Sequence, residues 1–171
     1  IAVSIVILYH AKIYVSGIEI FKGGFLGVDI FFVISGYLIT SILFQELQQK
    51  GTISFSYFYQ RRVRRILPAL FFIMFVSFFF AWKYLLPSRF IEFSESIISS
   101  VFFASNFYFH FNGMEYAAQD GLLKPFLHTW SLSVEEQFYL VFPLLFLISY
   151  KFFKNRLILI FAFLALISFF Y

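Results

Sequence analysis

The sequence lacks the residues that soluble or disulfide-stabilised proteins need. It contains no cysteine, which excludes disulfides, thiol nucleophiles and zinc–thiolate sites. Charged residues make up 13% of its 171 residues, about half the share of a typical soluble domain, so a soluble globular fold is not expected. Aromatic residues reach 25%, which argues against disorder because disordered chains contain few of them. These absences leave an integral membrane protein.

The apolar stretches between charged residues predict an all-α, polytopic bundle of about six transmembrane helices. Hydrocarbon offers unpaired backbone groups no partner, and a spanning helix needs about 20 mostly apolar residues. The predicted helices cover residues 1–15, 26–45, 66–86, 93–111, 131–150 and 156–171. Because the chain begins with Ile1 inside an apolar run, without a basic leader, we expect a piece of a longer protein.

The arginines set the expected topology. Arginines crowd residues 61–65, which places segment 46–65 on the cytoplasmic side as an amphipathic interfacial helix. Pro68 then falls in the first turn of the next helix. Counting onward places the basic loop 149–156 outside, against the positive-inside rule. This conflict disappears if segment 93–111 re-enters the membrane; we predict a crossing and leave re-entry open.

Two ionisable residues flank the first loop, and such residues at membrane depth are functional hypotheses. His10 can accept a proton from a hydroxyl, although an interfacial histidine bonded to backbone or water explains it equally well. Asp29 opens the next helix, where the helix dipole favours a carboxylate, and it could also meet and orient His10. We expect Gly24, Gly27 and Gly36 to permit close helix approach.

The basic segment supplies candidate anion-binding residues. Arg62 and Arg65 are three residues apart, and Arg61 and Arg65 are four apart, so both pairs share a helix face. Guanidinium forks match phosphate oxygens, whereas the plainer alternative is an anchor that reaches lipid headgroups. Nucleic acid is not an expected partner, because the basic run is short and lies between membrane helices.

A third cluster lies near residue 135. Ser133 and Glu136 fit a capping box and predict that a helix starts there. Glu135 is not needed for that box and precedes a long uncharged run, so we expect it to face a polar cavity. No metal is expected, because no short ligand pair joins the three histidines: His10, His110 and His128.

Five segments resemble, in order, the motifs of the membrane acyltransferase 3 family, which contains the O-antigen and exopolysaccharide O-acetylases: LYHA at 8–11, GGFLGVDIFFVISGYLIT at 23–40, FYQRRVRRILPAL at 58–70, SNFYF at 105–109 and HTWSLSVEEQFYLVFPLL at 128–145. The resemblance covers about residues 1–150 and is closest to the O-antigen branch at 117–139. It implies that 1–171 is the N-terminal part of one integral-membrane acyltransferase domain. That domain would have roughly ten helices and lie in the bacterial inner (plasma) membrane.

The same resemblance implies roles for individual residues. His10, Asp29 and Glu135 match the family's catalytic positions. The R-x-x-R element falls on Arg62 and Arg65, with Arg61 beside it, and is implicated in handling acyl-coenzyme A.

The implied reaction transfers an acetyl or other short acyl group from acyl-CoA, such as acetyl-CoA, to a carbohydrate hydroxyl. The expected acceptor is a cell-surface carbohydrate such as the O-antigen of lipopolysaccharide, or a lipid-linked glycan, and membrane lipid is a further partner. A transporter or flippase of acyl groups or lipid-linked sugars is the alternative. Transporters tend to contain inverted repeats, and no repeat is visible in this sequence.

Overall fold

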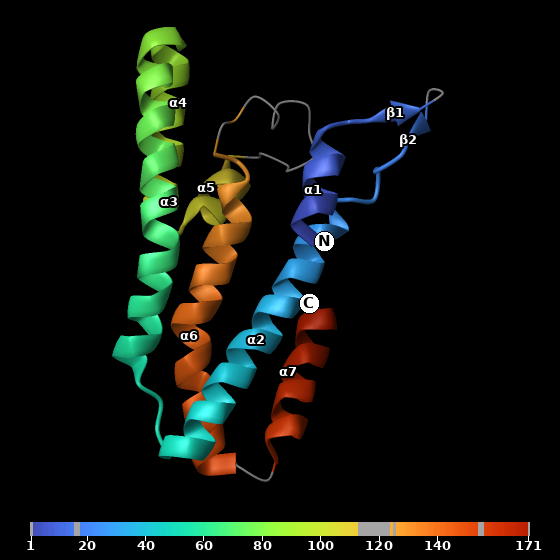
Figure 1. Ribbon diagram of the computed structural model, residues 1–171, viewed down its shortest axis with the longest axis vertical. Helices are drawn as coiled ribbons and strands as arrows, with labels where there is room; N and C mark the ends of the chain where they lie inside the picture. The colour runs from blue at the N-terminus through green and yellow to red at the C-terminus, as the bar shows by residue number, and fades with distance from the viewer. Residues whose placement is uncertain (1, 16–17, 113–123, 125, 154–155, 171) are drawn as a thin grey trace. The chain divides into compact units, whose positions relative to one another are not determined.

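The computed structural model describes residues 2–15, 18–112, 124, 126–153 and 156–170 (Figure 1). Two short strands, β1 (Tyr14–Val15) and β2 (Ile18–Glu19), pair antiparallel, and the other described elements are helices. The helices follow in this order: α1 (Ala2–His10), α2 (Leu26–Lys50), α3 (Phe55–Tyr84), α4 (Pro87–Val101), α5 (Ser105–Phe111), α6 (Thr129–Phe153) and α7 (Leu157–Phe170).

Three of these helices, α2, α3 and α6, are long and apolar enough to cross a membrane. They contain 25, 30 and 25 residues, and about 20 suffice for a hydrocarbon core of about 30 Å. Their outward surfaces are apolar: on α3, Phe72, Phe75 and Phe79 are 68%, 75% and 64% exposed. Lipid covers such a surface without the cost that water imposes. The protein is therefore an integral membrane protein.

The predicted first helix, 1–15, is too long. Helix α1 ends at His10, and Lys12 takes a φ of 46°, a left-handed conformation that does not continue a helix. Residues 14–15 instead form β1. The last predicted helix, 156–171, corresponds to the 14-residue α7.

The predicted interfacial helix over 46–65 is also wrong. Helix α2 continues to residue 50, where Gly51 takes a φ of 70° and donates its N–H to the Leu47 carbonyl. Helix α3 then runs unbroken through the arginines into the apolar segment, so Pro68 lies inside it. Arginine favours helix, and long membrane helices tolerate an internal proline, which explains why one helix replaces two.

The single helix predicted over 93–111 is interrupted in the structure. Helix α4 ends at Val101 and α5 begins at Ser105. Between them, Phe103 takes a φ of 50°, an outlier for a bulky residue. Its carbonyl accepts a hydrogen bond from Gln137 Nε2 at 2.7 Å, which holds the break against α6. The segment is therefore two short helices and not the one continuous helix that was predicted.

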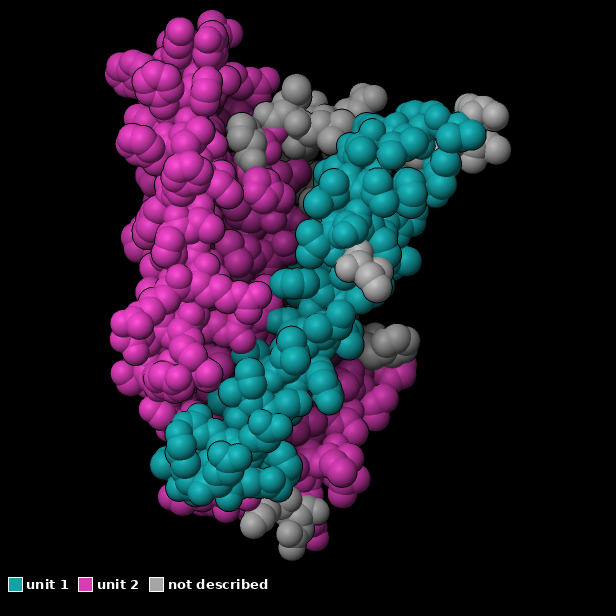
Figure 2. Space-filling view, viewed as in Figure 1, with its two compact units in different colours: residues 1–52 teal, residues 53–171 magenta. Residues whose placement is uncertain are grey.

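The chain divides into two compact units, residues 1–52 and residues 53–171 (Figure 2). In the first unit, α1 packs against the first turns of α2. A Cβ at Gly24 would lie 2.7 Å from the Ile5 carbonyl oxygen, and one at Gly27 would lie 2.7 Å from that of Ala2. These contacts confirm the predicted close approach at two glycines and show that the helices are antiparallel.

Gly36, the third glycine of that prediction, does not permit close helix approach. A Cβ at Gly36 would meet no atom within 4 Å among the described residues. The Gly36 carbonyl instead accepts a hydrogen bond of 2.7 Å from Thr40 Oγ1, one turn further along α2. Gly36 is therefore not a point of close helix approach in this unit.

The second unit has a core of apolar side chains from α3, α4 and the residues before α6. Its buried members are Leu70, Met74, Ala81, Phe93 and Phe126, and the last two rings lie 5.6 Å apart. This core fixes α3 and α4 beside the start of α6. The polar side chains of α6 therefore meet neighbours whose positions are set by apolar packing. The predicted loop 112–127 lies mostly outside the described residues.

Candidate functional site

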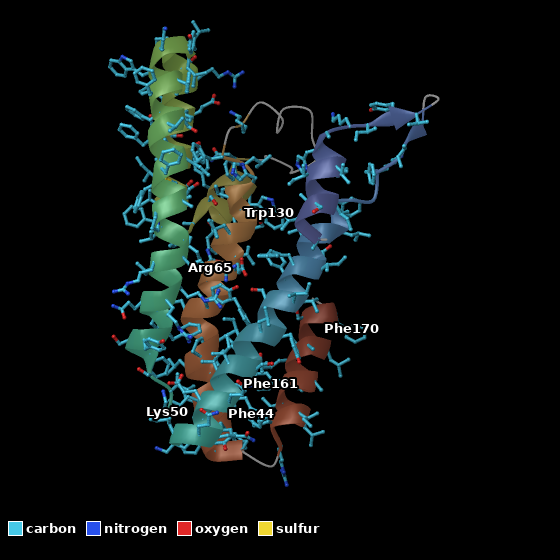
Figure 3. All side chains as sticks on the ribbon, in the orientation of Figure 1. Phe44, Lys50, Arg65, Trp130, Phe161 and Phe170 are labelled. Carbon is cyan, nitrogen blue, oxygen red and sulfur yellow. The ribbon has the colours of Figure 1, made fainter. Side chains whose placement is uncertain are left out.

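Only one of the predicted arginines of α3 turns inward. Arg62 is half-buried, whereas Arg61, Arg64 and Arg65 are exposed; Figure 3 labels Arg65 on α3 and Trp130 near the start of α6. The ion pairs within the described part of the chain involve other cations. The positive charge of these four residues has no ion-paired counter-ion there.

Arg62 lies over an aromatic ring that a carboxylate holds in place. Its Cζ is 4.2 Å from the centroid of the Tyr139 ring and 5.7 Å from that of Phe58. A guanidinium stacks favourably on such rings. The Tyr139 hydroxyl donates to Glu135 Oε1, one turn earlier on α6, and both side chains are buried. Glu135 thus supports the ring beneath Arg62.

The predicted capping box at Ser133 and Glu136 is wrong. Helix α6 begins at Thr129, so Ser133 lies in its second turn, where its Oγ is 2.7 Å from Ser105 Oγ. Thr129, a hydroxyl residue four positions before Ser133, begins the helix, and this start leaves Glu136 inside it. That was the sequence signal for a second carboxylate inside α6, one with a buried Oε1, and the sequence analysis missed it.

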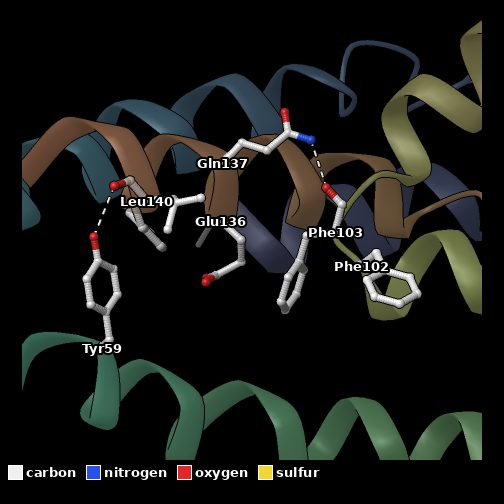
Figure 4. Close-up of a pocket in the computed structure, with 7 residues that line it drawn as sticks. Tyr59, Phe102, Phe103, Glu136, Gln137 and Leu140 are labelled. Atoms are coloured by element: carbon white, nitrogen blue, oxygen red, sulfur yellow. Dashed lines mark hydrogen bonds between the residues drawn. The ribbon is translucent and has the colours of Figure 1, made fainter. Parts of the chain in front are cut away.

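Glu136 points from α6 towards α3 (Figure 4). Its Oε1 is buried and has no hydrogen-bond partner among the described residues. A buried polar atom without a partner is uncommon in proteins and calls for an explanation. Glu136 therefore joins the candidate site.

A pocket of about 200 Å³ lies against Glu136, between α3, α6 and the break after α4. Its walls include Tyr59, Phe102 and Phe103. The Tyr59 hydroxyl donates to the Leu140 carbonyl oxygen at 3.0 Å. The pocket is thus mainly aromatic and apolar, with a carboxylate at one side.

A second polar cluster lies near the start of α6, before Glu136, and has every hydroxyl in contact with a partner. Ser100 Oγ and Thr129 Oγ1 are 2.7 Å apart, Thr129 Oγ1 and Ser105 Oγ 3.0 Å, and Ser105 Oγ and Ser133 Oγ 2.7 Å. All four residues are buried. This hydroxyl cluster ties α4 and α5 to α6, which explains Ser100 and Ser105 of segment 93–111 as structural.

The remaining predicted site residues, His10 and Asp29, lie in the first unit. His10 ends α1, is exposed, and has Nδ1 3.0 Å from the Val6 carbonyl oxygen. Asp29 is exposed in the first turn of α2. The antiparallel register sets Gly24 beside Tyr9 and Gly27 beside Ala2, so Asp29 lies level with the start of α1 and His10 with its end. The structure brings the two helices together and staggers these residues along them.

Charged residues of α4 form a separate group. Glu92 pairs with Arg89 at 3.1 Å and with Lys124, which precedes α6. The hydrogen bond from Lys124 is the main reason that the pKa of Glu92 lies below its usual value. This group links α4 to the chain before α6 and leaves no carboxylate unpaired, so we interpret it as structural.

The family model described as an acyltransferase domain, of the acyltransferase 3 type, matches residues 1–171. The chain belongs to the acyltransferase 3 family. The match includes both units, so His10, Arg62 and Glu135 all lie in segments of the acyltransferase domain.

Named relatives of this acyltransferase 3 family member come from bacteria. The chain is 38% identical over 159 residues to "Peptidoglycan O-acetyltransferase OatA" of Listeria monocytogenes. These aligned residues make up 93% of this chain and 25% of that protein. The chain is 39% identical over 151 residues to "O-acetyltransferase OatA" of Staphylococcus aureus, with coverage of 88% and 24%. The chain thus spans about a quarter of the length of the curated relatives it matches. No solved structure matches it significantly.

Proposed function

We propose that the protein containing this chain transfers an acetyl group from acetyl-CoA to a hydroxyl of cell-wall carbohydrate. Membership of the acyltransferase 3 family supports acyl transfer. The names of the relatives support an O-acetyl product and favour peptidoglycan as the acceptor, in place of the O-antigen expected from the sequence. The observation that carries the proposal is the arginine face of α3, where Arg62 lies over Tyr139 without an ion-paired carboxylate among the described residues.

The arginines are proposed to hold the donor. Coenzyme A carries phosphates, and guanidinium groups bind phosphate oxygens through charge-assisted, often paired, hydrogen bonds. Arg61 and Arg65 are exposed and Arg62 is half-buried on the same helix, so phosphates can reach all three. Glu135 serves as a positioning residue, because its bond to Tyr139 fixes the ring on which Arg62 rests.

His10 is proposed as the general base. It takes the proton of the acceptor hydroxyl while the hydroxyl oxygen attacks the thioester carbonyl carbon. A carbon–oxygen bond forms, the carbon–sulfur bond breaks, and coenzyme A leaves as a thiolate that recovers a proton. Asp29, on the helix that contacts α1, would stabilise the imidazolium through its negative charge.

The test uses the full-length protein in proteoliposomes, with acetyl-CoA and a peptidoglycan disaccharide as acceptor. His10→Ala should lower the rate of acetyl transfer about 10²–10⁴-fold, the usual contribution of general base catalysis. His110→Ala is the matched control, because His110 is also exposed at the end of a short helix. Normal transfer by His10→Ala, or an equal loss in His110→Ala, would contradict the proposed mechanism.

A further inference from the structure

The pocket beside Glu136 differs from the rest of the second unit in one respect: it contains a buried polar atom without a partner. Glu136 Oε1 is buried and makes no hydrogen bond among the described residues. Gln137, the next residue, donates to the Phe103 carbonyl at 2.7 Å and to Asn106 Oδ1 at 2.9 Å, and accepts from Asn106 Nδ2. The free hydrogen-bonding capacity at this site therefore lies with Glu136.

The dimensions of the pocket limit what it can hold. Its volume is about 200 Å³. Sites for entire small molecules usually measure about 300–1,000 Å³. The pocket therefore suits a segment of a ligand and not the whole of one.

The chemistry of the walls narrows the choice further. A carboxylate oxygen accepts hydrogen bonds, so the bound segment must supply an N–H or O–H donor. A phosphate would be repelled by Glu136. A sugar ring carries several hydroxyls, and burying them against aromatic walls with one free acceptor would leave most without partners. A slender, mainly apolar chain with an isolated donor fits best.

The position of the pocket connects it with the arginines. Tyr59, in its wall, and Arg62 are three residues apart and share a face of α3. Arg62 also lies over Tyr139, which lines the same pocket. A ligand whose phosphates bind the arginines would thus place the chain that follows them at this pocket.

We infer that the pocket receives the amide-bearing pantetheine arm of the acyl-CoA donor, with the carboxylate of Glu136, which lines the pocket, accepting a hydrogen bond from an amide N–H of that arm. This inference rests on the proposed function, because it takes acyl-CoA as the donor. It assigns a role in binding to Glu136, which forms no capping box and is not the carboxylate that holds Tyr139.

The experiment compares equilibrium binding of coenzyme A with that of 3′-phosphoadenosine 5′-diphosphate, which lacks the arm, to the full-length protein. Glu136→Leu should weaken binding of coenzyme A about 10- to 100-fold, the usual effect of losing a hydrogen bond to a charged group. Its affinity for the nucleotide should not fall. Glu95→Gln is the control, since this exposed carboxylate of α4 accepts a bond from Tyr108 at 3.0 Å, away from the pocket.

A ligand variant gives the same test without relying on a mutant fold. A coenzyme A analogue whose arm amides are replaced by esters should bind the wild-type protein weakly, by the same factor. It should bind Glu136→Leu no worse than coenzyme A does, because the two changes remove one interaction.

Three results would overturn the inference: unchanged coenzyme A affinity in Glu136→Leu, an equal loss for coenzyme A and the nucleotide, or a loss confined to a peptidoglycan disaccharide. The last would assign the pocket to the acceptor. A wild-type protein that binds no coenzyme A would contradict the proposed function as well. Arm-dependent binding without acetyl transfer would contradict only the proposed function.

Discussion

Two levels of α6 differ in how their polar groups are satisfied. Near its start, the hydroxyl cluster of Ser100, Ser105, Thr129 and Ser133 has each oxygen 2.7–3.0 Å from another. Further along the helix, Glu136 Oε1 has no partner among the described residues, and Arg62 rests on a ring without an ion pair. Satisfied buried groups hold a structure together, whereas unsatisfied ones cost stability and persist where a ligand completes them.

The largest effect on donor binding is expected at Arg62. Arg62→Ala should raise the KM for acetyl-CoA about 10- to 100-fold, because a hydrogen bond to a charged group is lost. Arg64→Ala, an exposed position on the same helix, should change KM by no more than about threefold. Steady-state kinetics with saturating acceptor would measure both. Equal effects of the two substitutions would indicate a general basic surface instead of a specific donor site.

Substitutions in the hydroxyl cluster should change the stability of the protein and not its binding of the donor. Ser133→Val removes one of the two partners of Ser105 Oγ and the acceptor of the Ser105 N–H, which lies 3.3 Å from Ser133 Oγ. We expect the free energy of unfolding to fall by about 1–3 kcal/mol. Denaturant unfolding in detergent measures this loss, and the KM for acetyl-CoA should stay unchanged. A raised KM in a protein of normal stability would mean that the hydroxyl cluster also contacts donor.

The smallest effect concerns the charged group of α4. Because the pKa of Glu92 is lowered on folding, its contribution to stability is complete above the ordinary carboxyl pKa and is lost as the pH falls through the lowered value. The melting temperature of Glu92→Gln should therefore fall less than that of the wild type between neutral pH and about pH 3. Both pairs are partly solvent-exposed, so the difference is small. Identical pH profiles would show that the Lys124 contact does not contribute.

Residue patterns predicted the apolar spans of α2 and α6 well, since composition and length determine which segments suit lipid. The same patterns failed where local signals competed. Pro68 and the arginines marked a boundary in sequence, yet α3 continues through both. Phe103 gave no sign of a break, because a positive φ at phenylalanine depends on a tertiary contact, here with Gln137.

The candidate site was predicted in residue type more than in arrangement. Charge at membrane depth pointed to Arg62 and Glu135, and these lie on two sides of the Tyr139 ring. Glu136 was missed because a four-residue capping pattern explained it locally. In the structure α6 starts at Thr129, and Glu136, inside the helix, points towards α3. Helix starts depend on packing that a short sequence pattern does not report.

The most direct test is a structure of the full-length protein with coenzyme A bound. The account predicts phosphates at Arg61, Arg62 or Arg65 and an arm amide nitrogen about 3 Å from a carboxylate oxygen of Glu136. Coenzyme A bound elsewhere, with the pocket beside Tyr59 and Glu136 left without the arm, would contradict the account.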